Sequence, residues 1–176
     1  CDLAQSNAVT QISQVAEERF GKVDVLINNA GTTAVAADPY QDEASWYRTL
    51  QVNLKASFLL GGAVAKSMER QGSGSIINIA SIGALLGFRD NPSYQAAKGG
   101  LRQLSRAMAR DFGSHGIRVN TVCPGYIRTQ MTERSYQDEA MRQARTSRTL
   151  LGRWGDPEDL VGACLFLASD AASYIT

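Results

Sequence analysis

Residues 23–31 read VDVLINNAG, a largely apolar run that ends in Asn-Asn-Ala-Gly. An apolar run without alternating polar positions is typical of a strand buried on both faces of a parallel sheet, and Asn and Gly then favour a loop. Two further runs have this character, GSGSIINIAS at 72–81 and GIRVNTVCPG at 116–125. We therefore expect three buried parallel strands, each followed by a loop of small or polar residues.

Segments with helical periodicity lie between the expected strands. The first carries an apolar face and stops at Gly21, and longer helical segments cover about 43–70 and about 92–112. A parallel sheet needs crossovers of this length, and alternating strands and helices indicate helices on both faces. The sequence thus predicts an α/β fold with a doubly wound parallel sheet, in a single domain over residues 1–176.

The composition is that of an ordinary globular domain and restricts the classes of partner. The 176 residues are 44% hydrophobic and 20% charged, with a net charge of +1, so no broad attraction to nucleic acid or to a membrane is expected. Cys1, Cys123 and Cys164 have neither metal-ligand spacing nor a disulfide pattern. We therefore expect no metal and a reducing, cytoplasmic compartment.

The stretch PSYQAAKGG at 92–100 places Tyr94 and Lys98 one helical turn apart, on the same face. A free phenol has a pKa of about 10, and a nearby ammonium group favours the phenolate. The spacing predicts that Lys98 lowers the pKa of Tyr94 and makes it a general acid/base. Ser81 ends the second strand, where its hydroxyl could bond a substrate oxygen, and Asn53 is a polar residue within an apolar helical stretch.

Each of these features taken alone also has a reading without function. Tyr and Lys occur four residues apart by chance, and a serine at a strand end often caps a turn. Asn53 could be satisfied by hydrogen bonds within the fold, and the Asn-Asn-Ala-Gly run could be only a turn.

In combination and in order, the residues resemble the short-chain dehydrogenase/reductase family over nearly the whole chain. The matching segments are Asp2-Leu3, NNAG at 28–31, Asn53 in VNL, Ser81, Tyr94 and Lys98 as S-x12-Y-x3-K, PGYIRT at 124–129 and GRWGDPEDL at 152–160.

The resemblance implies a Rossmann-like fold, NAD or NADP as cofactor, and defined roles for four residues. Tyr94 would be the general acid/base, and Lys98 would lower its pKa and hold the nicotinamide ribose. Ser81 would polarise the substrate oxygen, and Asn53 would anchor a water in the proton relay.

The resemblance also assigns residues to the cofactor and reveals segments that the chain lacks. The family's glycine-rich phosphate loop, the second strand and the last strand are absent, so we expect a domain that is incomplete at both ends and inactive by itself. Tyr94 and Lys98 would also contact the cofactor. The other contacts expected by resemblance are Asp2 and Leu3 beside the adenine, Asn29, Ala30 and Gly31 on the adenosine ribose side, and Ile127 and Thr129 at the nicotinamide carboxamide.

The expected activity is the interconversion of a secondary alcohol and a ketone with NAD(P). A sugar, polyol or sugar acid is one substrate class, because GRWGDPEDL resembles gluconate 5-dehydrogenase-like members of the family. A 3-oxoacyl thioester on acyl carrier protein is the alternative. A non-catalytic binding or scaffold protein with the same fold is a second alternative.

Two further features concern substrate charge and assembly. Arg142, Arg145 and Arg148 would form one row on a helix, and at least one could meet an anionic substrate, although a solvated face is the simpler reading. The two long helices carry apolar residues beyond what one sheet face obviously needs, and the resemblance implies a four-helix bundle between subunits of a dimer or tetramer. Such residues include Leu59, Val64, Leu101 and Met108.

Overall fold

The computed structural model describes residues 1–5, 7–33 and 38–176. Its sheet has three parallel strands in the order β1-β2-β3, and Ile76 in the middle strand lies opposite Leu26 on one side and Val119 on the other. The strand prediction is confirmed, and all three carboxyl ends lie at one edge of the sheet. The strands are β1 (Val25–Asn28), β2 (Gly74–Ile79) and β3 (Ile117–Val122).

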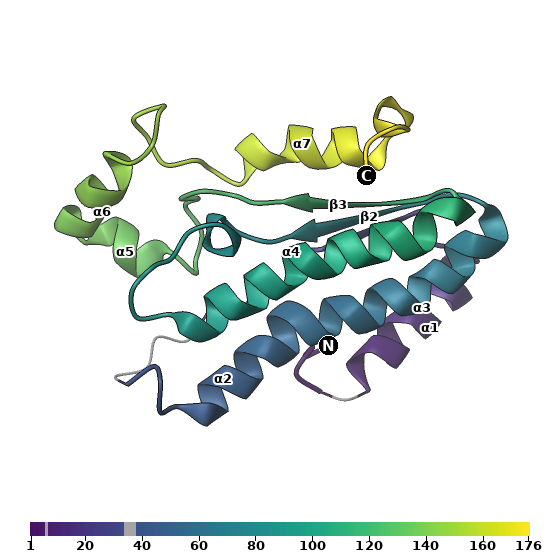
Figure 1. The fold of residues 1–176 in the computed structure, drawn as a ribbon, viewed down its shortest axis with the longest axis horizontal. Coiled ribbons are helices and arrows are strands. Elements are labelled where there is room, and N and C mark those ends of the chain that lie inside the picture. The colour runs from purple at the N-terminus through teal and green to yellow at the C-terminus, as the bar shows by residue number, and fades with distance from the viewer. Residues whose placement is uncertain (6, 34–37) are drawn as a thin grey trace.

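Helices cover both faces of this sheet. Figure 1 shows α7 on one side and α3 and α4 on the other, which confirms the doubly wound arrangement. None of the helices among the described residues is long and apolar enough to cross a bilayer. The α-helices are α1 (Ala8–Phe20), α2 (Glu43–Leu50), α3 (Ala56–Gln71), α4 (Pro92–Phe112), α5 (Glu133–Gln137), α6 (Glu139–Thr146) and α7 (Glu158–Ala168).

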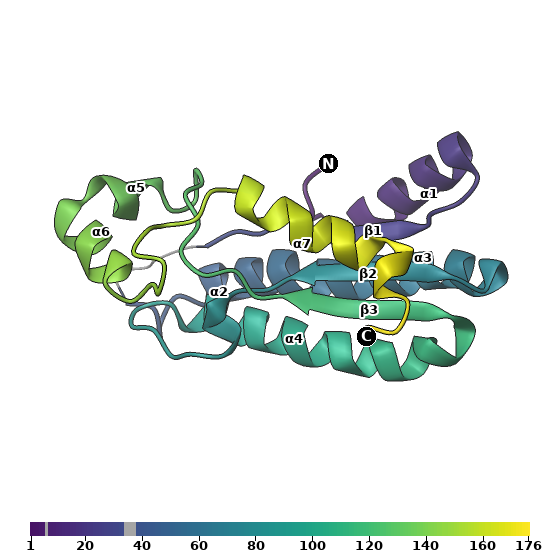
Figure 2. The ribbon, with the colours of Figure 1, turned by 90° about the horizontal axis from the view of Figure 1, so that it is seen from above.

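The first strand is less buried than its apolar sequence predicts. Val25 and Ile27 are 37% and 46% exposed, whereas Asn28 is buried. Figure 2 shows β1 at one side of the sheet, and it pairs only with β2 among the described strands. Because strand side chains alternate between faces, one face of an edge strand can stay uncovered while the other packs on a helix. The expectation of complete burial was wrong for β1.

The helix expected over 43–70 is continuous, but its middle turn is widened. A π-helical segment, η1 (Gln51–Lys55), joins α2 to α3 and contains Asn53. A π-turn accommodates one extra residue and is often found at functional sites. The sequence pattern did not reveal this widening, since apolar periodicity does not distinguish an α-turn from a single π-turn.

The core lies between β2, β3 and the helices α3 and α4. Val64, Leu101 and Met108 are each less than 10% exposed and belong to this core. Val64 and Met108 pack with strand residues of their own chain and Leu101 is buried too, which corrects the expectation that these three are surplus residues for a bundle. Leu59 is half-buried. The large side chains that are exposed on the long helical region include Phe58 on α3 and Trp46 on α2, at 53% and 37% exposure.

Candidate active site

The loops that follow the three strands meet at the carboxyl edge of the sheet. Figure 1 shows β2 and β3 pointing toward the end where α4 begins and where α5 and α6 lie. The N–H of Ala80 donates to the carbonyl of Val122 at 2.8 Å, and the N–H of Ile82 donates to that of Pro124 at 2.9 Å. The exits of β2 and β3 are thus fastened together directly beside Ser81.

Ser81 precedes a short 3-10 turn, η2 (Ile82–Ala84), and caps it. Its Oγ accepts the N–H of Gly83 at 3.0 Å, so the capping reading is correct for this hydroxyl. Capping uses only an acceptor site, and the hydroxyl hydrogen stays free for a second bond. The same hydroxyl lies near enough to the Tyr94 phenol to lower the pKa of Tyr94.

Tyr94 lies in the first turn of α4, where its phenol is half-buried. Burial raises the pKa of Tyr94 above its ordinary value, and the bond to Ser81 only partly offsets this effect. The expectation of a lowered pKa is therefore wrong for the protein without cofactor. Loss of phenolate solvation outweighs the favourable interactions within the chain.

Lys98 is 3% exposed, and its ammonium group is bound to the end of β2. The Nζ atom donates to the carbonyl oxygen of Ile79 at 2.7 Å and lies 5.8 Å from the ring centroid of Tyr94. Burial lowers the pKa of Lys98 to about 8, against a smaller opposing effect of Cys123. The ammonium can therefore lose its proton under mildly alkaline conditions.

Asn53 is fully buried, and both ends of its amide are bonded to one residue. Its Nδ2 donates to the carbonyl of Thr32 at 2.7 Å, and its Oδ1 accepts the N–H of Thr32 at 2.9 Å. The side chain thus holds the loop after β1 against the widened helical turn. The role in a proton relay, which rests on resemblance, stays a prediction.

Gly31 brings Asn53 and Lys98 together. A Cβ atom on Gly31 would lie 3.0 Å from Asn53 Oδ1 and 3.7 Å from Lys98 Nζ, so the backbone approaches both side chains closely. A strand end that is open, glycine-bearing and next to an ammonium group suits a ribose or phosphate of a dinucleotide. Asn29 and Ala30, the neighbours of Gly31, are exposed at this edge.

The remaining residues expected at the cofactor lie in local turns. Asp2 is exposed and its Oδ1 accepts the N–H of Ala4 at 3.0 Å, while Leu3 is half-buried. Ile127 forms a parallel bridge with Gly155, and the N–H of Thr129 donates to Thr132 Oγ1 at 3.0 Å. The segment after β3 is therefore tied to the residues just before α7.

An aromatic cluster, which the sequence analysis missed, connects these segments to α5 and α6. Trp154 is 7% exposed, and its ring lies 5.5 Å from that of Tyr126 and 5.3 Å from that of Tyr136. Arg142 lies over Tyr136 and donates to its carbonyl, whereas Arg145 lies over both Tyr126 and Trp154 at 5.6 and 5.7 Å. The sequence signal for this cluster was the presence of three aromatic residues, namely Tyr126 in PGYIRT, Tyr136 in α5 and Trp154 in GRWG.

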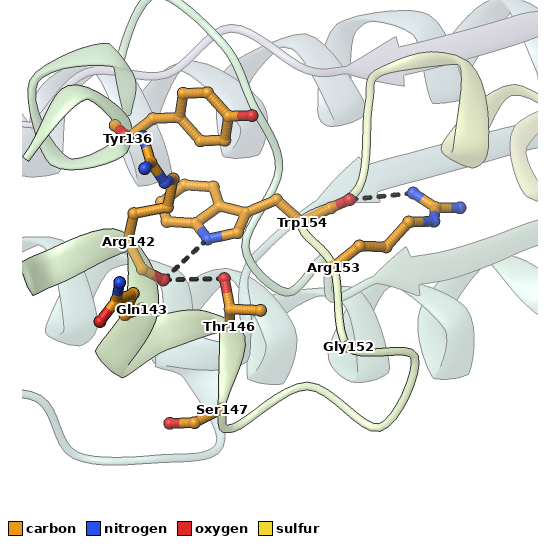
Figure 3. A pocket seen from close by; sticks show the side chains of 8 residues that line it. All are labelled: Tyr136, Arg142, Gln143, Thr146, Ser147, Gly152, Arg153 and Trp154. Atoms are coloured by element: carbon orange, nitrogen blue, oxygen red, sulfur yellow. Dashed lines mark hydrogen bonds between the residues drawn. The ribbon is translucent and has the colours of Figure 1, made fainter. Parts of the chain in front are cut away.

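A hollow of about 480 Å³ lies beside this cluster (Figure 3). Its polar groups are largely bonded to one another, since Trp154 Nε1 and Thr146 Oγ1 both donate to the carbonyl of Arg142. Arg153 donates to the Trp154 carbonyl and pairs with Asp159. The lining of this hollow includes neither Ser81 nor Tyr94, and it offers few unused groups to a ligand.

Comparison with known proteins agrees with this geometry. A family model described as Enoyl-(Acyl carrier protein) reductase, one of the short-chain dehydrogenases, matches residues 1–176. The gluconate 5-dehydrogenase of Gluconobacter oxydans is 38% identical over 174 residues, which are 99% of this chain and 68% of that enzyme. The chain belongs to the short-chain dehydrogenase/reductase family.

Other members of the short-chain dehydrogenase/reductase family are equally similar. The 3-oxoacyl-[acyl-carrier-protein] reductase of Thermotoga maritima is 39% identical over 169 residues, covering 94% of this chain and 68% of that enzyme. The crystal structure of a gluconate 5-dehydrogenase from Burkholderia cenocepacia, in complex with NADP and tartrate, matches with a TM-score of 0.94 at 35% identity. The match covers 100% of this chain and 69% of that one.

Two features of this short-chain dehydrogenase/reductase were not predicted from the sequence. A buried chain of hydrogen bonds runs from Asn28 to Asn78 and on to Ser105, each bond 2.8 Å long, and joins β1, β2 and α4. Asn78 within an apolar run was a signal for it. Gln95, next to Tyr94, binds the loop that precedes α4, and no sequence signal indicated this contact.

Proposed function

We propose that the protein is an NAD(P)-dependent oxidoreductase that interconverts a secondary alcohol and a ketone. The observation that carries this proposal is the placement of Ser81, at the exit of β2, near Tyr94 in the first turn of α4, with the Lys98 ammonium group 5.8 Å from the phenol ring. Ligands of doubly wound sheets bind at this edge. A scaffold protein would have no use for a hydroxyl, a phenol and a buried ammonium gathered at this edge.

In the direction of oxidation, the substrate hydroxyl would form hydrogen bonds with both Ser81 and Tyr94. Tyr94 would take the hydroxyl proton as the carbon–oxygen bond becomes a carbonyl, and Ser81 would donate to the developing oxygen. The nicotinamide, when bound, accepts hydride from the carbinol carbon. Because burial raises the pKa of Tyr94 and Ser81 lowers it only in part, the proposal also requires the positive charge of Lys98 to favour the phenolate.

The residues for the cofactor are those at the same edge, and the close approach at Gly31 fits a dinucleotide. Lys98 would hold the nicotinamide ribose, and Asn53 would keep the loop after β1 in place. The structural relatives carry either cofactor, as NADP in the Burkholderia enzyme and NADH in a 4-hydroxyisoleucine dehydrogenase, so the proposal covers NAD and NADP. The other proposed contacts are Asp2, Leu3, Asn29, Ala30, Ile127 and Thr129.

The proposed substrate is a sugar acid, or a related sugar or polyol. The support comes from the gluconate dehydrogenases among the relatives and from Arg145. Its guanidinium lies on two aromatic rings and has no hydrogen bond or ion pair with the described residues, so its donors remain available to a carboxylate. A 3-oxoacyl thioester is the second candidate, favoured by the Thermotoga relative.

The deciding experiment measures cofactor absorbance with the full-length protein. Sugar acids, the corresponding polyols and a 3-oxoacyl thioester are each tested with NAD, NADP and their reduced forms. We expect turnover of the sugar acid with kcat/KM at least tenfold above that of the thioester. Preference for the thioester would select the second candidate, and no turnover of any alcohol or ketone would support the scaffold alternative.

We also propose a homo-oligomer, a dimer or tetramer, in the cytoplasm, with no nucleic-acid or membrane partner. Phe58 and Trp46 support association, since large apolar side chains exposed along one helical region are common at subunit contacts. Light scattering on the full-length protein should give a dimeric or tetrameric mass, and Phe58→Glu should reduce it. A monomeric mass for the unaltered protein would contradict this proposal.

A further inference from the structure

Gln95 follows Tyr94 directly in α4, and its side chain turns back to the loop between Ser81 and Tyr94. The Oε1 atom accepts the N–H of Phe88 at 2.6 Å, and Nε2 donates to the carbonyls of Phe88 at 2.7 Å and Asn91 at 2.9 Å. Oε1 and Nε2 are therefore both bonded to this loop.

The loop has few other attachments to the body of the protein. Its first residues are held by turn hydrogen bonds from Ala84, Leu85 and Leu86 back to Ser81 and Ile82. Leu85 and Leu86 are 56% and 59% exposed. Within the described residues, the last part of the loop is tied down by Gln95 and by one bond from Asn91 to Thr33.

Gly83 is the point at which the loop, Gln95 and Ser81 converge. A Cβ atom on Gly83 would lie 3.5 Å from Ser81 Oγ, 3.6 Å from Gln95 Cγ and 3.8 Å from Phe88 Cδ2. The N–H of Gly83 donates to Ser81 Oγ at 3.0 Å. Phe88 and Gln95 therefore flank Gly83, whose N–H binds the Ser81 hydroxyl.

We propose that Gln95 is a positioning residue for the reaction, which holds Phe88 and Gly83 so that the Ser81 hydroxyl faces Tyr94 and the substrate oxygen. This inference rests on the proposed function, because it assigns Gln95 an effect on Ser81 rather than a chemical step. Misplacement of a reacting group by about 1 Å can cost about 100-fold in rate. Gln95 thus acts on catalysis without touching the substrate.

The test compares Gln95→Met with Gln103→Met in the full-length protein. Methionine keeps the length and packing of glutamine but makes none of the three bonds, and Gln103 is an exposed glutamine on the same helix. We expect Gln95→Met to lower kcat about 10- to 100-fold, with the dissociation constant of the cofactor unchanged. Hydrogen exchange of the Phe88 amide, measured without cofactor, should accelerate in Gln95→Met only.

The pH profile and a double variant separate positioning from general loosening. Since the Ser81 bond lowers the pKa of Tyr94, its loss should move the rising limb of kcat/KM for alcohol oxidation to higher pH. Lys98, whose ammonium group lies 5.8 Å from the Tyr94 ring centroid, is retained in every variant. In a Ser81→Ala background, Gln95→Met should have almost no further effect, because its route to the reaction is already removed.

Distinct results would overturn the inference and the proposed function. If the protein is active, Ser81→Ala is inactive and Gln95→Met equals Gln103→Met, the inference alone fails. It also fails if the losses from Ser81→Ala and Gln95→Met multiply. If Ser81→Ala retains full activity, or the protein oxidises no alcohol, the proposed function fails as well. Gln95→Ala is tested in parallel and replaces Gln95→Met in these comparisons if the methionine variant does not fold.

Discussion

Lys98 Nζ lies 2.7 Å from the carbonyl oxygen of Ile79 and 5.8 Å from the ring centroid of Tyr94. The ammonium group is thus fixed to the end of β2, although its backbone belongs to α4. Its hydrogen-bond partner among the described residues is the Ile79 carbonyl and not the phenol. The separation of the two groups therefore depends on how α4 packs on the sheet.

Tyr94→Phe should remove nearly all turnover and leave cofactor binding intact. The substitution deletes only the hydroxyl, and general acid/base catalysis is worth about 10²- to 10⁴-fold. Steady-state kinetics and calorimetry with the cofactor check the two parts of this prediction. A variant with more than about a tenth of the original activity would rule out the assignment of Tyr94.

Lys98→Met should change how stability depends on pH. The pKa of Lys98 is about 8 in the folded chain and near 10.5 when exposed, so between these values the unfolded chain binds more protons. By linkage, this group makes the folded state more stable as pH rises from about 8 to 10.5, and the contribution is lost as pH falls through the folded pKa.

Thermal unfolding of both proteins at pH 7 to 11 measures this effect. The unsatisfied Ile79 carbonyl destabilises Lys98→Met at every pH, but the difference in Tm should shift against the variant between pH 8 and 10.5. Other titrating groups are shared and cancel in the comparison. A difference in Tm that stays constant with pH would show that Lys98 titrates normally.

Asn53→Leu should loosen the loop after β1. The substitution fills similar volume but leaves the N–H and carbonyl of Thr32 without their partner, which should cost about 1–3 kcal/mol of unfolding free energy. Cofactor affinity should fall, because Gly31 lies against Asn53. Lys55→Ala, at an exposed position of the same π-turn, is the control and should change neither quantity. Unfolding in urea and cofactor titration are the measurements.

Arg145→Ala should raise KM for a sugar acid selectively. A charge-assisted hydrogen bond contributes about 1.5–3 kcal/mol, so the increase should be about 10- to 150-fold, with little change for the uncharged polyol. Arg142→Ala is a matched control from the same helix, since its guanidinium already binds the Tyr136 carbonyl. It should lower Tm and leave the preference for the acid intact. Equal KM values for Arg145→Ala and the unaltered protein would place this guanidinium in solvent.

Much of the fold and the central pair of the site followed from local sequence patterns. Tyr94 and Lys98 are four residues apart on a helix, so their shared face does not depend on the rest of the protein. The strands at 25–28, 74–79 and 117–122 were visible as apolar runs, and the helices between them required parallel pairing. The order of motifs along the chain was enough to indicate the family.

The tertiary structure determined the burial, the hydrogen-bond partners and the pKa values of those residues. Burial raises the pKa of Tyr94, Asn53 is occupied by Thr32, and Gln95 holds the loop before α4. Val64, Leu101 and Met108 proved to be core residues, whereas Val25 and Ile27 of an apolar strand stayed exposed. Solvation, hydrogen-bond partners and burial depend on segments that are distant in the sequence and meet only when the helices pack on the sheet. Local periodicity, in contrast, depends only on near neighbours, and for that reason the sequence alone determined the elements and their motifs.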